Sequence, residues 1–228
     1  SEPQGLFRAE GGTDGLLRGQ LSASLPSPFG TASLQASAFS LDGWRDFNRQ
    51  EVQRVLARID APLSASLTHT FHVQASNSRV EITGTQSRAE ILARSPAANA
   101  FTRLADIERR AQTWRLADRV AYAAPGWKGD VGVFLARTDA VFTRRDLSED
   151  QSLEFGADAR AAFEPNTSLP LRLDAGARLQ QGRRDAVMTL AGDGLPPRLG
   201  GVRTQPFADN RLTARAGAAW VQADLEPR

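Results

Sequence analysis

Histidines, which often act as catalytic or metal-binding groups, are few in this chain and are poorly placed to form one site. The two histidines, His69 and His72, are three residues apart. On a β-strand this spacing points them to opposite faces, so we expect His72 to face a polar interior and His69 an apolar side. A shared metal site is therefore not expected. The chain has no cysteine, which excludes disulfides, thiolate metal ligands and cysteine nucleophiles.

Carboxylates and arginines alternate along two segments rather than forming an isolated acidic pair. They are Glu154, Asp158, Arg160, Arg172, Asp174 and Arg178. A catalytic carboxylate pair needs a dry pocket that separates the two pKa values, whereas alternating charges of both signs are typical of a water-filled polar surface. No nucleophile elbow accompanies the serines. We therefore predict that the chain is not an enzyme.

One glycine-rich stretch, residues 192–201, begins like a phosphate-binding loop. Pro197 stands where the third glycine would be needed, and no helical pattern follows. We interpret the stretch as an extracellular loop and expect no cofactor.

The overall charge gives no reason to expect a nucleic-acid partner. Lysine and arginine number 28 against 26 aspartates and glutamates, a formal charge of +2, and the basic residues are dispersed. No run of 18 apolar residues is present, which excludes a transmembrane helix. A chain without such a helix can still cross a membrane as a β-barrel, because alternate residues then face lipid and lumen.

Apolar and polar residues alternate in five segments, strictly so in 171–180, which predicts β-strands with one apolar and one polar face. The segments are 17–25, 67–75, 153–161, 171–180 and 212–220. In the second segment His69 interrupts the apolar face. In the last one we assign Leu212, Ala214, Ala216, Ala218 and Trp220 to the apolar face, with Arg211, Thr213, Arg215 and Gly217 opposite.

The predicted strands are long and their polar faces are highly charged. Segments 109–122, 130–142 and 169–180 exceed the roughly 5–6 residues of a globular strand and reach the about 9–11 that cross a bilayer. Charged residues at consecutive positions of one face suit a wide polar lumen. We therefore predict an all-β fold that spans a membrane.

The breaks between these segments alternate between compact and long. The compact ones are 26–30, 60–62, 125–129, 164–166 and 226–227; the long ones are 42–51, 76–108, 138–151 and 181–210, and a short one, 11–15, comes first in their series. Outer-membrane barrels have short periplasmic turns and longer extracellular loops. The order predicts an antiparallel up-and-down barrel of about ten strands, with the proline-containing turns on the periplasmic side. Trp127 and Phe29 at short turns, and Trp44 and Phe142 near long breaks, would suit the two aromatic girdles.

Several loops resemble those of TonB-dependent siderophore receptors. Residues 41–49 resemble the Asp-Gly-aromatic-Arg loop that follows an early barrel strand in this family, and residues 8–18 resemble the first barrel hairpin. Residues 82–84, 89–94, Pro96, Asn99 and 105–110 resemble the next long loop and the arginine-rich strand. The family usually has Leu-Pro-Gly where Ile82-Thr83-Gly84 stands, so this part of the match is incomplete.

The resemblance implies a larger barrel of about 22 strands that is filled by an N-terminal plug. Neither a plug-like region nor a TonB box is recognisable here, so we expect residues 1–228 to form one partial outer-membrane barrel domain. The two unpaired edges of such a piece would be costly in lipid. Further strands complete it, or it closes on itself as a small barrel, or it is poorly stable alone.

The function that the resemblance implies is TonB-dependent import, across the bacterial outer membrane, of a scarce ligand such as an iron–siderophore complex. Its partners would be that ligand, the TonB complex through the plug, and outer-membrane lipid with lipopolysaccharide. Candidate ligand-binding residues on the extracellular loops are Trp44, Arg45, Arg49, Arg79, Arg88, Arg183 and Arg184. Each arginine could instead pair with lipopolysaccharide phosphates or with loop carboxylates. The alternatives are a passive porin or small barrel channel, and a structural or adhesive β-protein. No metal site is predicted, and the loops do not identify the ligand.

Overall fold

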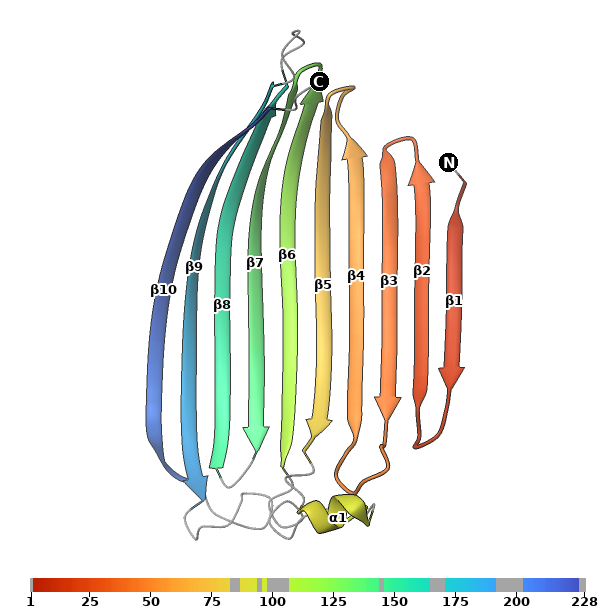
Figure 1. Cartoon of the computed structure of the whole chain (residues 1–228), viewed down its shortest axis with the longest axis vertical. Helices are drawn as coiled ribbons and strands as arrows, with labels where there is room; N and C mark the ends of the chain where they lie inside the picture. Colours follow the sequence, from red (N-terminus) through yellow and green to blue (C-terminus); the bar gives the residue numbers. More distant parts are fainter. Residues whose placement is uncertain are drawn as a thin grey trace.

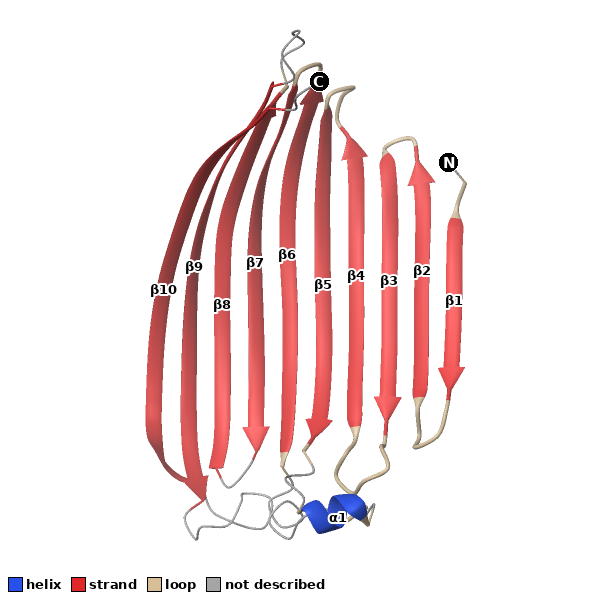
Figure 2. Cartoon of the chain, in the orientation of Figure 1, coloured by secondary structure: helices blue, strands red, loops and turns tan. Residues whose placement is uncertain are grey.

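The computed structural model describes residues 2–82, 87–93, 96–97, 107–143, 146–164, 171–191 and 203–225. They form ten strands and one short helix, α1 (Arg88–Leu92), as Figures 1 and 2 show. The strands are β1 (Gln4–Gly11), β2 (Leu17–Ser27), β3 (Gly30–Leu41), β4 (Gln50–Pro62), β5 (Leu67–Glu81), β6 (Glu108–Ala124), β7 (Trp127–Thr143), β8 (Asp146–Phe163), β9 (Leu171–Ala191) and β10 (Arg203–Leu225).

All ten strands belong to one antiparallel sheet in which each strand pairs with its neighbours in the sequence, from β1 to β10. In Figure 1 they stand side by side, and β1 begins and β10 ends at the end of the sheet opposite to α1. The predicted all-β, up-and-down topology of about ten strands is therefore confirmed. Within the described residues the sheet is not closed, because β1 and β10 each have one partner strand only.

The strand register builds one apolar and one polar face. Residues directly opposite each other on antiparallel strands share a face. One continuous row contains Val73, Leu116, Leu135 and Phe155 on β5 to β8. A row on the other face contains Thr70, Arg119, Gly132 and Asp158 on the same strands. The predicted apolar and polar faces are confirmed for segments 17–25, 67–75, 153–161 and 171–180, and the two histidines do lie on opposite faces.

The apolar face has aromatic residues at both ends. On β6, Trp114 and Tyr122 lie eight positions apart on this face, about 27 Å at about 3.4 Å per residue. At the turn end Trp127 packs against Phe163, with ring centroids 4.4 Å apart. We call the apolar residues of this face between the Trp114 end and the Trp127 end the apolar belt. Its length matches the about 25 Å apolar band of outer-membrane barrels.

The face predicted for β10 was wrong. Ala218 lies opposite Arg178 and Trp220 lies opposite Gly176. The residues predicted as apolar therefore lie on the polar face, namely Leu212, Ala214, Ala216, Ala218 and Trp220. Ala219 and Val221 face the same side as Ala177 and Ala175, in the apolar belt. Residues 214–219 are nearly all alanine and glycine, so alternation alone could not choose the face there. The register with β9 decides it.

Several predicted breaks were also wrong, because strands continue through them. β7 runs to Thr143 and β8 begins at Asp146, in place of a break over 138–151; β9 and β10 occupy most of 181–210; and β5 runs to Glu81. The charged residues that suggested loops pair within the sheet beyond the belt, as Arg137 does with Asp139 at 2.9 Å. Residues 60–62 and 127–129, expected in turns, lie in β4 and β7.

Other predicted connections agree with the structure. Gly126 has a φ of 76°, which the turn between β6 and β7 requires and which glycine adopts without strain. The longer connection 42–49 lies at the opposite end of the sheet, with α1 of the connection that follows β5 (Figure 2). The predicted loop 192–201, and residues 165–166 and 226–227 of the predicted turns, lie outside the described residues, as do most of 83–106.

Gly176 offers a test of the β10 register, because a Cβ at this position would overlap the Trp220 ring. We predict that Gly176→Ala lowers the free energy of unfolding by about 1–3 kcal/mol, the usual cost of overpacking. Urea titration measures the change. Gly19→Ala is the matched control, since a Cβ there meets nothing within 4 Å. Equal stability of the two variants would contradict the register, and adding Trp220→Ala to Gly176→Ala should restore most of the loss.

Candidate functional site

Three loops meet at the end of the sheet that carries α1. The backbone N–H groups of Asp42 and Gly43 both donate to the carbonyl oxygen of Asp14, each at 3.0 Å. The N–H of Asp46 donates to the carbonyl oxygen of Pro96 at 2.9 Å. Gly43, with a φ of 78°, lets the chain turn between these contacts. Asp14, before β2, and Pro96, after α1, are therefore both hydrogen-bonded to the loop 42–49.

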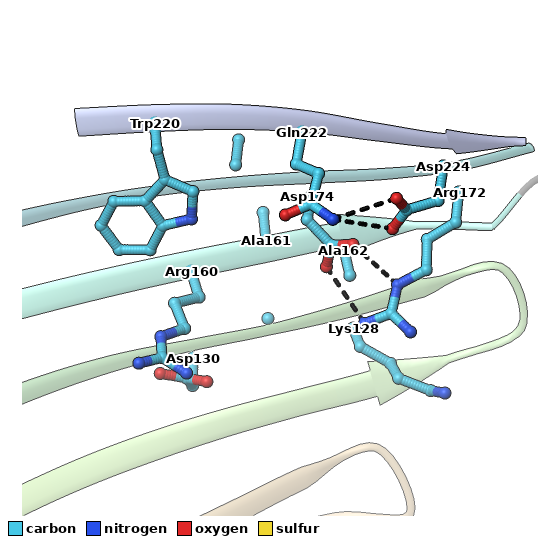
Figure 3. A pocket seen from close by; sticks show the side chains of 12 residues that line it. Lys128, Asp130, Arg160, Ala161, Ala162, Arg172, Asp174, Trp220, Gln222 and Asp224 are labelled. Atoms are coloured by element: carbon cyan, nitrogen blue, oxygen red, sulfur yellow. Dashed lines mark hydrogen bonds and ion pairs between the residues drawn. The ribbon is translucent and has the colours of Figure 1, made fainter.

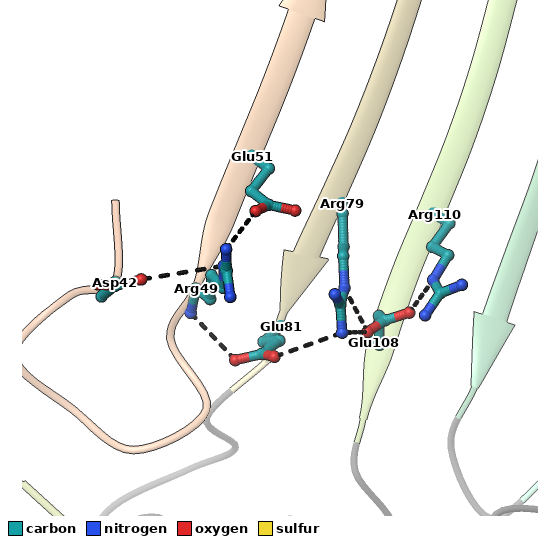
Figure 4. Close-up of polar contacts among 7 residues, drawn as sticks. All are labelled: Asp42, Arg49, Glu51, Arg79, Glu81, Glu108 and Arg110. Carbon is teal, nitrogen blue, oxygen red and sulfur yellow. Dashed lines mark hydrogen bonds and ion pairs between the residues drawn. The ribbon is translucent and has the colours of Figure 1, made fainter. Parts of the chain in front are cut away.

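A charged cluster lies beneath these loops, on the same face as the apolar belt and beyond Trp114 (Figure 4). Its centre is Glu108, whose side chain is 2% exposed. Arg79 donates from Nε to the Glu108 carboxylate at 2.7 Å, and Arg110 donates to the other oxygen. A buried carboxylate is tolerated when it is paired in this way. We call Asp42, Arg49, Glu51, Arg79, Glu81, Glu108 and Arg110 the loop-end cluster.

Arg49 connects this cluster to the loop 42–49. Its guanidinium lies 2.6 Å from the Glu51 carboxylate and 3.9 Å from that of Asp42. Its backbone N–H donates to the Glu81 carboxylate at 3.2 Å, and Glu81 lies 3.7 Å from Arg79. Carboxylates therefore partner Arg49 and Arg79, and the network fixes the base of two loops.

Of the predicted ligand-binding residues, the structure brings Trp44, Arg45 and Arg49 together in one loop. The Arg45 guanidinium carbon lies 5.9 Å from the centre of the Trp44 ring, a cation–π distance, and the indole is about half exposed. Arg88, the first residue of α1, is exposed. Ser87 and Glu90 cap this helix reciprocally, and the backbone N–H of Ser87, which donates to the carboxylate, lowers the pKa of Glu90.

Arg183 and Arg184 lie within β9 and not in a loop as predicted. As sequence neighbours on a strand they point to opposite faces. Arg184 lies on the polar face with Asp150, 2.9 Å from its Nε, and Arg183 donates to Asp185 at 3.0 Å. Arg211 on β10 also donates to Asp185, and these two guanidiniums, Arg211 foremost, lower the pKa of this carboxylate. The stabilisation is present at neutral pH and is lost as the pH falls through that lowered pKa.

The middle of the polar face carries an aromatic ring between arginines. Phe134 is buried and lies over Gly156, where a Cβ would overlap the ring. The guanidinium carbons of Arg115 and Arg178 lie 4.8 and 5.8 Å from the ring centre. The aromatic ring is therefore buried within the polar face, beside two guanidinium groups.

The polar face also has a hollow of about 640 Å³ near the turn end, between β7 and β10 (Figure 3). Its lining side chains include Lys128, Asp130, Arg160, Arg172, Asp174, Trp220, Gln222 and Asp224. Arg172 donates to Asp174 at 2.7 Å, and Gln222 donates to Asp224 at 3.0 Å. Trp220 lies flat at one end, over Gly176. Charges of both signs and one indole could hold a polar chain segment or a hydrated ligand.

Sequence reasoning missed the central residue of the loop-end cluster and the aromatic residues of the polar face. Glu108, Phe134 and Trp220 gave no signal alone, because each depends on a partner strand. One signal was available for the ion pairs: an arginine and a carboxylate two positions apart, as in Arg58 with Asp60 and Arg172 with Asp174. Residues at this spacing share a face of a strand and can pair along it.

The described residues contain no group of three or more histidines and carboxylates arranged to hold a metal ion. In the part of the chain that the structure describes, no helix is long and apolar enough to cross a membrane.

Comparison with known proteins places the fold. No family model matches the chain, and no curated protein matches its sequence. Among solved structures, it is similar to the ferric citrate transporter FecA in its unliganded form, with a TM-score of 0.75 and 12% identity over 98% of this chain and 34% of that one. The ferripyoverdine receptor of the outer membrane of Pseudomonas aeruginosa has a TM-score of 0.72 and 11% identity over 99% of this chain and 39% of that one.

A third similar structure is the ferric yersiniabactin uptake receptor FyuA from Yersinia pestis, with a TM-score of 0.69 and 12% identity over 98% of this chain and 44% of that one. The chain thus has the fold of part of the barrel wall of siderophore receptors, and it spans less than half the length of these structures. The proteins named are transporters and receptors, not enzymes.

Glu108 allows a test of the loop-end cluster. We predict that Glu108→Gln lowers the free energy of unfolding by about 1–3 kcal/mol, because the buried hydrogen bonds to Arg79 and Arg110 lose their charged acceptor. Asp139→Asn is the matched control, since its pair with Arg137 is exposed and should contribute less than about 1 kcal/mol. Urea unfolding measures both changes. Losses of the same size would show that the Glu108 network does not hold the loops.

Proposed function

We propose that this chain forms part of the wall of a TonB-dependent receptor in the bacterial outer membrane, which imports a scarce ligand such as an iron–siderophore complex. The observation that carries the proposal is the two-faced sheet with the barrel-wall fold of siderophore receptors. In such a barrel the apolar belt contacts lipid, and the polar face lines the lumen.

The aromatic residues support this orientation. Tyr122, Trp127 and Phe163 lie at the turn end of the belt, and Trp114 lies at the other end. Aromatic side chains of this kind sit at the two interfaces of a membrane. The turn end is then periplasmic, and the end with α1 is extracellular. The outer face from the level of Trp114 outward, with Arg183 in that row and Arg79 beyond it, would lie beside lipopolysaccharide.

Transport itself would depend on parts outside this sequence. The chain corresponds to 34–44% of the similar solved structures reported above. By the resemblance of its loops to the TonB-dependent family, a plug inside the barrel would receive energy from the TonB complex. This segment would contribute lumen wall and extracellular loops, and none of its residues would carry the energy-coupling step.

The ligand-binding part of this segment would be the loop 42–49. Trp44 offers an exposed aromatic surface with Arg45 beside it, and Arg49 joins their loop to the strands. Ferric siderophores are often anionic, and guanidinium groups bind oxygen anions through charge-assisted hydrogen bonds. Arg88 on α1 and Arg184 on the lumen face would be secondary contacts. Arg79 and Arg183 are weaker candidates, because both pair with carboxylates on the opposite face.

A passive channel is the alternative, since a charged polar face would also suit a water-filled pore. Conductance in planar bilayers separates the two. A receptor closed by a plug gives no steady conductance, whereas a porin gives a constant one.

We predict that the full-length protein binds one class of ferric siderophore and that Trp44→Ala combined with Arg45→Ala weakens this binding by on the order of tenfold, the loss of one or two good contacts. Titration of purified protein with ferric citrate, a ferric hydroxamate and a ferric catecholate measures it. Arg183→Ala is the matched control and should leave the affinity unchanged. If no siderophore binds and conductance is steady, the receptor function is wrong. If binding persists unchanged in the double variant, the loop assignment is wrong.

A further inference from the structure

On β5 and β6 the apolar face carries an ionisable pair inside the belt, and Arg215 of β10 lies on the same face four strands away. His69 on β5 and Asp118 on β6 are diagonal neighbours on this face, since Val120 lies opposite His69 and Phe71 lies opposite Asp118. The imidazole Nε2 lies 2.6 Å from a carboxylate oxygen of Asp118. The two side chains are 33% and 47% exposed, so they point outward and are not covered by other strands.

The surroundings of this pair are apolar on every side. β4 presents Ile59 and Ala61, and β7 presents Val131 and Val133. Along the two strands of the pair, the same face carries Leu67, Phe71, Leu116 and Val120. Tyr122 is the nearest other titratable residue on this face, and none of the described residues of β4 or β7 adds a charge beside the pair.

The depth of the pair in the belt is unusual for ionisable groups. Asp118 is midway between Trp114 and Tyr122, four positions from each, about 14 Å along the strand. His69 lies nearer to the turn end. If the belt faces lipid, which rests on the proposed function, both groups lie within the hydrocarbon. Isolated charges there are strongly disfavoured, and ionisable residues in membranes are rare unless they pair.

We infer that His69 and Asp118 together form a one-proton site in the lipid-facing surface, which makes the stability of the barrel depend on pH. With one shared labile proton the pair is neutral overall, as imidazole with carboxylic acid or as imidazolium with carboxylate. Loss of that proton leaves a carboxylate, and gain of a second leaves an imidazolium. Both states place a net charge in the hydrocarbon, so the folded barrel is disfavoured at both ends of the pH range.

The test compares the wild type with His69→Leu, Asp118→Leu and the double leucine variant. The full-length protein is folded into dilauroylphosphatidylcholine vesicles, and urea unfolding is followed from acid to alkaline pH. Each single variant should have a folded-to-unfolded ratio lower than the double variant by on the order of a hundredfold at a pH where the remaining group is charged. The double variant should be at least as stable as the wild type. The difference between them should grow toward both pH extremes.

Arg137 and Asp139 give the matched control, an ion pair at the end of the belt on the same face, where Arg137 lies opposite Trp114 and Asp139 lies beyond it. The corresponding leucine variants should show coupling of less than about threefold, because water solvates each partner. Single His69 or Asp118 variants as stable as the double would overturn the inference, and so would a difference from the wild type that does not vary with pH. Failure of the wild type to insert into the vesicles would instead contradict the proposed membrane function.

Discussion

Backbone hydrogen bonding is the constraint on which the structure depends. Inside a hydrocarbon layer no water is available, and each unpaired N–H or C=O group costs several kcal/mol. The sheet has the pairing that such a layer would require, because neighbouring strands pair along their length, as β6 and β7 do from Glu108 and Thr143 to Ala124 and Trp127. This pairing dictates alternating faces, and from these follow both the belt and the charged polar wall. The outer edges of β1 and β10 are where it would have to be completed.

The charges follow a second, local rule. Arginines and carboxylates two positions apart pair along one strand, as Arg58 with Asp60 and Arg172 with Asp174 on the polar face. The same spacing occurs on the other face beyond the belt, in Arg137 with Asp139. Strands can therefore extend past the apolar belt with their charges paired, and they do so most in β9 and β10. The loop-end cluster uses this chemistry to join the loops to the strands.

The sequence alone predicted the strand number, the order and most faces, because alternation at Leu173, Ala175 and Ala177 leaves one assignment. It failed where the pattern is ambiguous or the partner is remote. Residues 214–219 could face either way until β9 fixed the register, and charged strand ends were mistaken for loops. The contact between His69 and Asp118 joins residues 49 positions apart, and Glu108 is buried by arginines of two strands. Such pairs depend on register, which periodicity does not supply.

The most direct measurement compares two adjacent alanines of β10, Ala218 on the polar face and Ala219 in the apolar belt. Each is replaced by cysteine, labelled with an environment-sensitive fluorophore, and examined in the full-length protein in vesicles. A lipid-borne quencher should quench the label at position 219, and aqueous iodide the label at position 218. If both labels respond alike to the two quenchers, the sheet does not separate lipid from lumen, and the membrane-barrel account is contradicted.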